Sequence, residues 1–481
     1  MILDSFPFSA LPENATRRAI SSFIALVEKK LGVIVSYDAN SILFGRPDLT
    51  EATTLASLLE KNGIVVSLKP SIVPPDEPPI KLWSAQCAGR AGSLVGVGGG
   101  SSHSDLQAIY ATLAEGVERC IWFTQSDYCK KTLHATPDEL RRRKIRFVAP
   151  ERFAGFSATQ RESHPRRKLR SDASYFWTSG TSLLTGAPAH LPFQTLSGKG
   201  SAEDEASDAE PAIRHRTTIG LATWPTQKGA QLAGALEIIE REAYMVMWLN
   251  QLTLPRIALG PVCEESPTLL AFVKKCERYG LKVHAIRMLT DAPTHAICVV
   301  LEDESEVEPR FALGLKAHRS LAYAIEKAMT EALRARRAYR NYAASGNRWD
   351  STKPILEIGH VDRLYYWGLP ENARNLEFLI AGKEAAHETR EWDSDTEEGH
   401  LSRILLWCRT SNFECISIPL TSSKKNITPW HIEMVVMPDL QPTYLLERSR
   451  SFGCNRWQEV PKKFNISPRS EPYEERPHPY A

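Results

Sequence analysis

The sequence lacks several features that mark particular classes of protein. Its nine cysteines contain no C-x-x-C pair, and the two closest, Cys408 and Cys415, are seven residues apart, which argues against a structural zinc knuckle. An odd, scattered set of cysteines indicates reduced thiols. No stretch approaches the roughly 18 uncharged apolar residues of a membrane-spanning helix, and the first residues do not read as a signal peptide. We therefore expect a cytoplasmic protein.

The sequence also has almost no net charge. Lysine and arginine number 59 against 57 aspartates and glutamates, so the formal charge is +2. This excess is too small to attract nucleic acid or an anionic membrane in general. Hydrophobic residues at 42% and charged residues at 24% are typical of a folded globular protein rather than a disordered chain.

The length of 481 residues predicts more than one domain. Residues 1–70 are predicted to form a small α/β unit, in which two helices are each followed by an apolar strand. Closely spaced prolines predict a linker over residues 71–80. Residues 81–481 return to helices and strands around a long irregular loop at 197–216. The predicted fold class is therefore mixed α/β (α+β).

The pattern E-x-x-E-R occurs on two predicted helices. Residues three apart share a helix face, so Glu115 and Glu118 project together on the first helix, as do Glu237 and Glu240 on the second. An isolated copy is usually a surface motif, because a glutamate four residues before an arginine forms an ordinary intrahelical ion pair. The pattern alone therefore does not indicate a functional site.

The second helix, however, is predicted to be buried. Over residues 230–249 its only charges are Glu237, Glu240, Arg241 and Glu242, and apolar residues lie all round it. A buried carboxylate pair is costly unless a proton, an arginine or a metal ion neutralises it. Two such pairs indicate a hard cation such as magnesium, whereas a di-iron site would need Glu-x-x-His repeats, which are missing.

Two further features are informative only in combination. A third predicted helix begins near residue 320 and carries Glu331, with Lys327 and Arg334 one turn to either side as possible contacts of phosphate oxygens. Ahead of the first helix, the segment GVGGGSS predicts a turn whose backbone amides can hold an anion. It is neither a P-loop nor a dinucleotide fingerprint, because Ser101 occupies the last glycine place and no G-K-[ST] follows.

The order of the glycine-rich segment and the three glutamate helices resembles the YcaO family, ATP-dependent enzymes that modify peptide backbones. Three other segments are similar to parts of the family: FWTSGTSLLTGAPAHLP before the second helix, IGLAT directly ahead of it, and WHIEMVVMPDLQP near the end. The resemblance runs from about residue 80 to the C-terminus. It implies a YcaO-like, ATP-binding catalytic domain over residues 81–481.

The resemblance places ATP and Mg²⁺ among the glutamate helices. The residues that it implies at the nucleotide are Ser101, Glu115, Glu118, Arg119, Glu237, Glu240, Lys327, Glu331 and Arg334. The implied magnesium ligands are Glu115, Glu118, Glu237, Glu240 and Glu331. Carboxylates and ATP can share a site only if divalent cations or basic residues bridge their negative charges.

Several positions depart from the family pattern. A lysine of the glycine-rich segment is replaced by Ser101, a serine before the first E-x-x-E-R by Ala111, and an asparagine by Ile219. A glutamine of the third helix is replaced by Arg334, and the glycine of a late P-G-L segment by Asp439. These replacements leave open altered nucleotide contacts or a non-catalytic scaffold.

The C-terminal tail resembles that of azoline-forming members, which end in Pro-x-Pro-x-Pro close to the active site. This chain ends in RPHPYA, so Pro477 and Pro479 keep two prolines and Ala481 replaces the last. The resemblance implies that these three residues act in catalysis, although a disordered end is an equal alternative. His318 and the C-terminal carboxylate are the candidate general bases, but a histidine at a helix start is more often a cap or core residue.

The implied reaction is ATP-dependent cyclodehydration, which converts Cys, Ser or Thr of a ribosomal precursor peptide into thiazolines or oxazolines. The implied partners are this precursor, a separate ThiF-like protein that binds its leader, and a flavin-dependent azoline dehydrogenase. Residues 1–70 lie outside the resemblance and are predicted to dock a partner or the precursor, with a structural cap as the alternative. Thioamide or macroamidine formation remains an alternative product. Nucleic-acid binding is the other class, suggested only by the basic runs RRRKIR, PRRKLR and RARRAYR.

Overall fold

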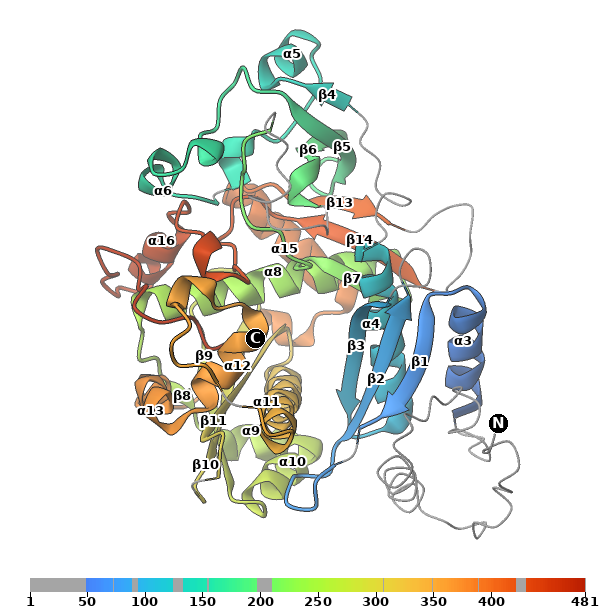
Figure 1. Ribbon diagram of the computed structural model, residues 1–481, viewed down its shortest axis with the longest axis vertical. Coiled ribbons are helices and arrows are strands. Elements are labelled where there is room, and N and C mark those ends of the chain that lie inside the picture. The colour runs from blue at the N-terminus through green and yellow to red at the C-terminus, as the bar shows by residue number, and fades with distance from the viewer. Residues whose placement is uncertain are drawn as a thin grey trace. The chain divides into compact units, whose positions relative to one another are not determined.

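The computed structural model divides the chain into two compact units, Met1–Val117 and Glu118–Ala481, which we describe separately (Figure 1). The residues that the structure describes are 49–71, 73–88, 94–123, 133–153, 155–196, 210–305, 307–347, 349–387, 389–420 and 430–480. The division between the units falls within helix α4 (Asp105–Phe123).

The described residues of the first unit form a three-stranded antiparallel sheet in the order β1-β2-β3. The strands are β1 (Val65–Pro70), β2 (Lys81–Ala88) and β3 (Leu94–Ser102). Helix α3 (Thr50–Lys61) precedes them in the chain, and the first part of α4 follows them. The second predicted helix and strand of residues 1–70 are thus confirmed, with Leu55 and Leu59 on the buried face of α3. The first predicted helix and strand lie outside the described residues.

The proline-rich segment differs from the prediction, because it joins two strands of one sheet. Strands β1 and β2 are antiparallel neighbours in which Lys69 pairs with Ser84, so residues 71–80 connect them within the first unit. Proline lacks an amide donor and therefore excludes this segment from the sheet. Composition indicated irregular backbone correctly, but it could not distinguish a link between strands from a link between domains.

The glycine-rich segment also differs from the prediction, because it is strand β3 rather than a turn at a helix start. A Cβ atom on Gly98 would lie 2.6 Å from the backbone nitrogen of Gly116, and one on Gly100 would lie 2.2 Å from the carbonyl oxygen of Ala108. Gly116 and Ala108 belong to α4. The glycines therefore allow the strand to lie directly against the helix backbone.

The described residues of the second unit form two sheets. One has the strand order β11-β10-β9-β8-β12, and the other follows β4-β5-β13-β14-β7 with β6 beside β5. The strands of the first sheet are β8 (Arg256–Ile257), β9 (Leu281–Arg287), β10 (His295–Asp303), β11 (Phe311–His318) and β12 (Glu384–Ala385). The strands of the second are β4 (Leu133–Ala135), β5 (Tyr175–Ser182), β6 (Pro188–Pro192), β7 (Leu221–Trp224), β13 (Ile416–Pro419) and β14 (His431–Val436). The mixed α/β class is confirmed.

Two long helices, α8 (Gln227–Asn250) and α11 (Leu321–Ala344), carry Glu237, Glu240 and Glu331. The shorter α-helices are α5 (Pro137–Arg142), α6 (Ala158–Glu162), α9 (Leu259–Glu265), α10 (Pro267–Glu277), α12 (His360–Gly368), α13 (Pro370–Ala373), α14 (Glu377–Ile380), α15 (Glu397–Thr410) and α16 (Arg456–Lys463). Ser266 caps α10 by accepting from the Leu269 amide, and Gly280 with φ of +70° follows its end.

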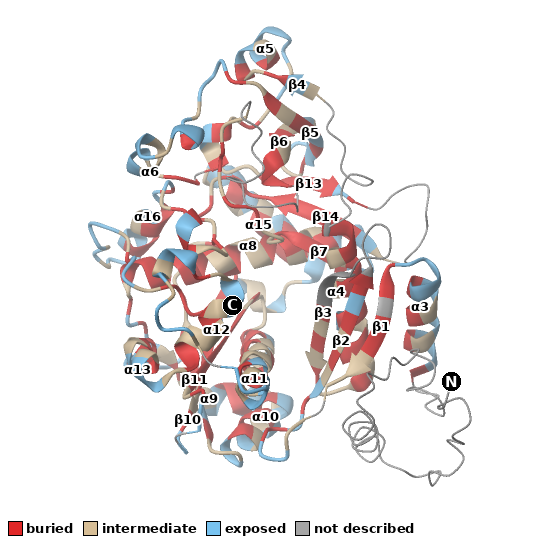
Figure 2. Cartoon of the chain, viewed as in Figure 1, coloured by how far each residue is buried: buried red, intermediate tan, exposed pale blue. Residues whose placement is uncertain are grey.

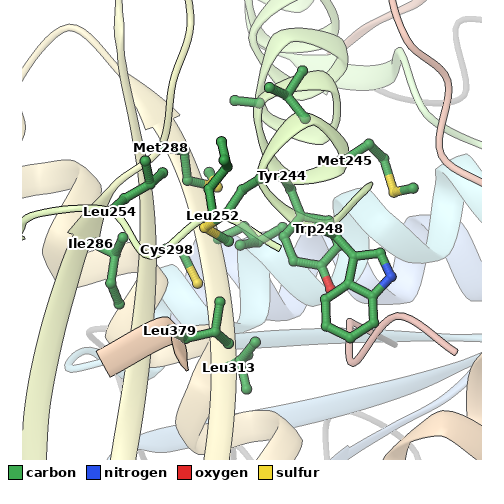
Figure 3. Packing of buried hydrophobic residues seen from close by; sticks show 14 of the residues in the cluster. Tyr244, Met245, Trp248, Leu252, Leu254, Ile286, Met288, Cys298, Leu313 and Leu379 are labelled. Carbon is green, nitrogen blue, oxygen red and sulfur yellow. The ribbon is translucent and has the colours of Figure 1, made fainter. Parts of the chain in front are cut away.

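Helix α8 is the core element of the second unit. It contacts strands β7, β11 and β14 and helices α15 and α16, so most of its residues are buried (Figure 2). In its C-terminal half, Tyr244 and Trp248 pack with Cys298, Leu313 and other buried residues of the first sheet (Figure 3). A helix that is apolar all round is enclosed on all sides, and the predicted burial of α8 is confirmed.

The described residues include most of the cysteines and all the labelled helices considered above. Eight of the nine cysteines lie there, and all eight are buried and form no disulfide. Within the same residues, no helix has the length and apolar character needed to cross a bilayer.

Candidate active site

Each glutamate helix is paired with a strand that precedes it, and a backbone amide in that strand or directly before it holds a glutamate oxygen. The pairs of amide donor and Oε2 acceptor are Gly99 and Glu115 at 3.0 Å, Gly220 and Glu237 at 2.9 Å, and Leu315 and Glu331 at 2.6 Å. The sequence separations are 16, 17 and 16 residues, so the same short strand-to-helix connection recurs three times. A hydrogen bond from a backbone amide to one oxygen orients the carboxylate.

Glu240 is held in a similar way, but by a distant strand. The amide of Ala317 in β11 donates to Glu240 Oε2 at 2.8 Å, although the two residues are 77 positions apart. This bond joins α8 to the strand that leads into α11. The glutamates of these two helices are thereby brought to one place.

Three carboxylates surround Arg241. Its Nη2 lies 3.4 Å from Glu240 Oε1 and 3.6 Å from Glu237 Oε1, and Glu331 also acts on it electrostatically. Burial raises the pKa of Glu240, which is only 3% exposed, while Arg241 and Lys316 oppose this rise. Burial alone would lower the pKa of Arg241, but Tyr480 and the carboxylates raise it well above its usual value. Arg241 is therefore a permanent cation inside the cluster.

Besides Arg241, positive charge at the cluster comes from Lys316, which acts on Glu240, and from Arg334, which lies 3.8 Å from Glu331. Glu237, Glu240, Glu331 and Arg241 by themselves carry a formal charge of −2. A bound dication would offset this deficit. From the sequence, Arg241 is expected only as a charge on a buried helix and not as part of the site.

The C-terminal tail reaches the cluster through Tyr480. The hydroxyl of Tyr480 donates to Glu331 Oε1 at 2.5 Å, and its amide donates to the hydroxyl of Tyr244 at 3.1 Å. The guanidinium carbon of Arg241 lies 4.1 Å from the centre of the Tyr480 ring, which is a cation–π contact. Sequence reasoning missed Tyr480, because no pattern marks it apart from its place after Pro479.

Two buried contacts fix the preceding part of the tail. The indole N–H of Trp367 donates to the carbonyl oxygen of Pro477 at 3.1 Å. His478 is fully buried, its Nε2 lies 2.9 Å from the carbonyl oxygen of Tyr444, and burial lowers its pKa well below the usual value. The tail is thus packed into the unit as far as Tyr480. Ala481 lies outside the described residues.

His318, a candidate general base, ends strand β11. Its Nδ1 accepts from the Ser320 amide at 3.0 Å, and its Nε2 lies 3.3 Å from Nη1 of Arg319. Burial, together with Arg319 and Lys316, lowers its pKa to about 3. Both ring nitrogens are occupied at the start of α11, so this environment favours a structural role over that of a base.

The other expected nucleotide contacts lie in both units. On α11, Nη2 of Arg334 lies 3.8 Å from Glu331 Oε1, while burial lowers the pKa of Lys327. Arg119 donates to the hydroxyl of Thr218 at 3.2 Å, within the second unit. The remaining expected residues lie on β3 and α4: Ser101 pairs with Leu82, Glu115 receives the Gly99 amide, and Glu118 follows on α4.

The acidic residues fit magnesium better than a transition metal. In the described part of the chain, no group of three or more His, Cys, Asp or Glu side chains forms a ready-made metal cage. Magnesium does not need one, since one or two carboxylates and the phosphates of a nucleotide usually hold it together with water. The oriented carboxylates of α8 and α11 can supply such ligands.

Solved structures share the fold of this chain at low sequence identity. A heterocyclase in complex with substrate and cofactor is 20% identical with a TM-score of 0.68, and the match covers 88% of this chain and 57% of that protein. YcaO from Methanopyrus kandleri, bound with AMPPCP and Mg²⁺, is 15% identical with a TM-score of 0.58 over 85% of this chain and 94% of that one. This chain therefore corresponds to little more than half of the heterocyclase.

A third structure belongs to an assembly. The E. coli microcin synthetase McbBCD complex contains a chain that is 13% identical with a TM-score of 0.55, and the match covers 78% of this chain and 88% of that one. No curated protein matches the sequence. These likenesses concern the fold.

The family follows from a match to the sequence itself. A family model described as YcaO cyclodehydratase, ATP- and Mg²⁺-binding, matches residues 99–441. This range begins in β3 and includes all three glutamate helices. The expected cofactors, ATP and magnesium, are confirmed. Since the match covers more than half of the chain, the chain belongs to the YcaO family.

Proposed function

We propose that this chain is an ATP-dependent peptide cyclodehydratase, which forms thiazolines from Cys and oxazolines from Ser or Thr in a ribosomal precursor. The observation that carries the proposal is the bond from Tyr480 to Glu331, which brings the proline-containing tail to the glutamate cluster. The tail is the feature by which the sequence resembles azoline-forming members. Its contact with the cluster supports a role in the reaction.

The chain's own residues would orient the reactants. When bound, ATP supplies the phosphoryl group, and magnesium offsets its charge. The proposed magnesium ligands are Glu115, Glu118, Glu237, Glu240 and Glu331. The proposed further contacts of the nucleotide are Ser101, Arg119, Lys327 and Arg334. Backbone amides hold four of the five glutamates, which reduces the rearrangement needed on binding.

The proposed reaction removes one water in two stages. A substrate thiol or hydroxyl loses its proton and attacks the preceding amide carbon, and the resulting oxyanion attacks the γ-phosphorus of ATP, releasing ADP. The nitrogen then loses its proton, a C=N bond forms, and the C–O bond breaks to release phosphate. Both nitrogens of His318 are occupied, which disfavours this histidine as the base.

Two macromolecular partners and one enzyme complete the proposal. The precursor is the substrate, a ThiF-like protein binds its leader, and a flavin-dependent dehydrogenase oxidises the rings. The microcin synthetase complex with bound pro-MccB17 supports an assembly of this kind. Residues 1–70 are proposed to dock the ThiF-like protein, and Leu58 on α3 offers an exposed apolar contact. Leu58→Asp should weaken co-purification without loss of solubility, and unchanged co-purification would reject this docking role.

Reconstitution tests the activity. The full chain is combined with Mg²⁺, ATP, a ThiF-like partner and a short precursor rich in Cys, Ser and Thr from neighbouring genes. Loss of one water per ring by mass spectrometry, matched by equal amounts of ADP and phosphate, supports cyclodehydration. Tandem fragmentation then separates azolines from macroamidines, and replacement of oxygen by sulfur identifies a thioamide. Nucleotide binding without turnover would indicate a scaffold.

A further inference from the structure

A cavity of about 280 Å³ adjoins the glutamate cluster within the second unit. Glu331 and Arg334 of α11 line it on one side, and Pro479 and Tyr480 of the tail line it on another. The residues of the proposed reaction therefore also form walls of this cavity. A group bound there lies beside the tail.

Most of the remaining wall is apolar. Phe311 and Leu313 of β11 and Leu364 and Trp367 of α12 line the cavity, and Val361 lies there with 48% exposure. An apolar cavity beside a polar cluster favours a ligand group that leaves water on binding.

Two polar groups of this wall, on Arg336 and Trp367, have hydrogen-bond partners within the protein. Arg336 pairs with Asp303 at 2.5 Å and donates to the carbonyl oxygen of Pro309 at 2.8 Å. The indole N–H of Trp367 is bound by Pro477, and burial lowers the pKa of His360. These groups are therefore poor partners for a charged ligand, which further favours an apolar one.

We propose that this cavity binds an aromatic or large aliphatic side chain of the precursor peptide, next to the residue that is cyclised. This inference rests on the proposed function. The volume lies just below the range of small-molecule sites, so it suits one side chain rather than a length of peptide. With that side chain inserted, the peptide backbone passes Tyr480 and Glu331, where the amide would be activated.

Ala338 offers a way to fill the cavity with little disturbance of the core. It lies on α11, is exposed, and lines the cavity, whereas Ala344 on the same helix is exposed and does not line it. Ala338→Trp should block the cavity, and Ala344→Trp is the matched control. Thermal unfolding of both variants shows whether they remain folded.

The first measurement uses small probes and the full chain. Saturation-transfer NMR should detect binding of N-acetyl-phenylalaninamide with an affinity on the order of 1 mM, as expected for a ligand of this size. N-acetyl-serinamide should bind at least ten-fold more weakly. Ala338→Trp should reduce phenylalaninamide binding at least ten-fold, and Ala344→Trp should not. Equal binding of the two probes, or no effect of Ala338→Trp, would overturn the inference, as would displacement of the probe by Mg²⁺ and ATP.

The second measurement separates this inference from the proposed function. Precursors with Phe or Ser beside the cyclised residue are compared, and the wild type should cyclise the Phe precursor at least ten-fold faster by kcat/KM. Ala338→Trp should remove this preference. Ring formation without any preference overturns the cavity inference and leaves the function standing. Probe binding that depends on Ala338, without ring formation on any precursor, supports the cavity and rejects the function.

Discussion

Helices α4 and α8 carry the same E-x-x-E-R pattern in different surroundings. On α4, Glu115 is partly exposed and receives an amide from the glycine-rich strand β3. On α8, Glu240 is buried, and Arg241 lies between it and Glu237 in a cluster that Tyr480 closes. The pattern therefore determines which way the acids project. The rest of each helix determines how strongly their charges must be compensated.

The largest expected effect concerns the arginine of each pattern. Arg241→Leu should lower the free energy of unfolding by about 3–5 kcal/mol, because it leaves buried carboxylates without their cation. Arg119→Leu, which loses a bond to Thr218, should cost about 1 kcal/mol. Denaturant unfolding without magnesium measures both. Added Mg²⁺ should restore part of the stability only in Arg241→Leu. Equal losses of unfolding free energy in the two variants would show that burial does not distinguish the helices.

The second prediction concerns the ligand role of α8. Glu237→Gln should weaken magnesium-dependent ATP binding by about 100-fold, since a lost metal ligand costs more than the 10–100-fold typical of supporting residues. The unfolding free energy without ligands should stay the same or rise, because the cluster loses one excess negative charge. Calorimetry measures the binding, with exposed Glu264→Gln as the control. Tight ATP binding without metal would contradict the assignment.

The third prediction concerns the close packing of a strand against its glutamate helix. In β11 and α11 this packing accompanies the hydrogen bond from the Leu315 amide to Glu331. A Cβ atom on Gly314 of β11 would lie 2.0 Å from the carbonyl oxygen of Ala328 in α11. Gly314→Ala should therefore cost about 2 kcal/mol or more through overpacking, and Gly100→Ala in β3 should behave alike. Gly260→Ala, where no atom lies within 4 Å, is the control for thermal unfolding. A harmless Gly314→Ala would show that the two backbones can separate freely.

The fourth prediction concerns the tail, which contacts α11 and α8. Tyr480→Phe should slow ring formation about ten-fold, equal to about 1.4 kcal/mol of barrier, because Glu331 loses a hydrogen bond beside the reacting amide. ATP binding should change little. This variant is cleaner than removal of residues 477–481, which would also remove the buried His478. Full-rate cyclisation by Tyr480→Phe would exclude a role for the hydroxyl.

The smallest expected effect is a pH dependence on α8. Burial raises the pKa of Glu240 above its unfolded value, so the folded state binds more protons over the interval between the two values. The contribution of Glu240 to stability is therefore present at low pH and lost as pH rises through its folded pKa. Glu240→Gln should be more stable than the wild type at neutral pH, and this difference should vanish near pH 4. A constant difference across the pH range would contradict the raised pKa.

Local sequence patterns predicted several helices of the second unit correctly. Periodicity placed α8, α10 and α11, and Gly280 marked the end of the helix before β9. The spacing of Glu237 and Glu240 put both on one face of α8 because a helix repeats every three to four residues. The resemblance to a family, rather than any period, indicated ATP.

The errors arose where a local signal has more than one tertiary outcome. Prolines exclude residues 71–80 from a sheet whether they join domains or neighbouring strands, and here they join β1 to β2. Glycines permit both a tight turn and a close backbone approach, and in β3 the second holds. Neither choice can be made without the partner element.

The sequence by itself determined which residues share a helix face, which helix is buried and which family the chain resembles, because these depend on nearby residues or on motif order. The tertiary structure alone decided which groups meet across long separations. Tyr480 and Glu331 are 149 residues apart, and Ala317 and Glu240 are 77 apart. Such contacts follow from how strands and helices pack, and no local period records them.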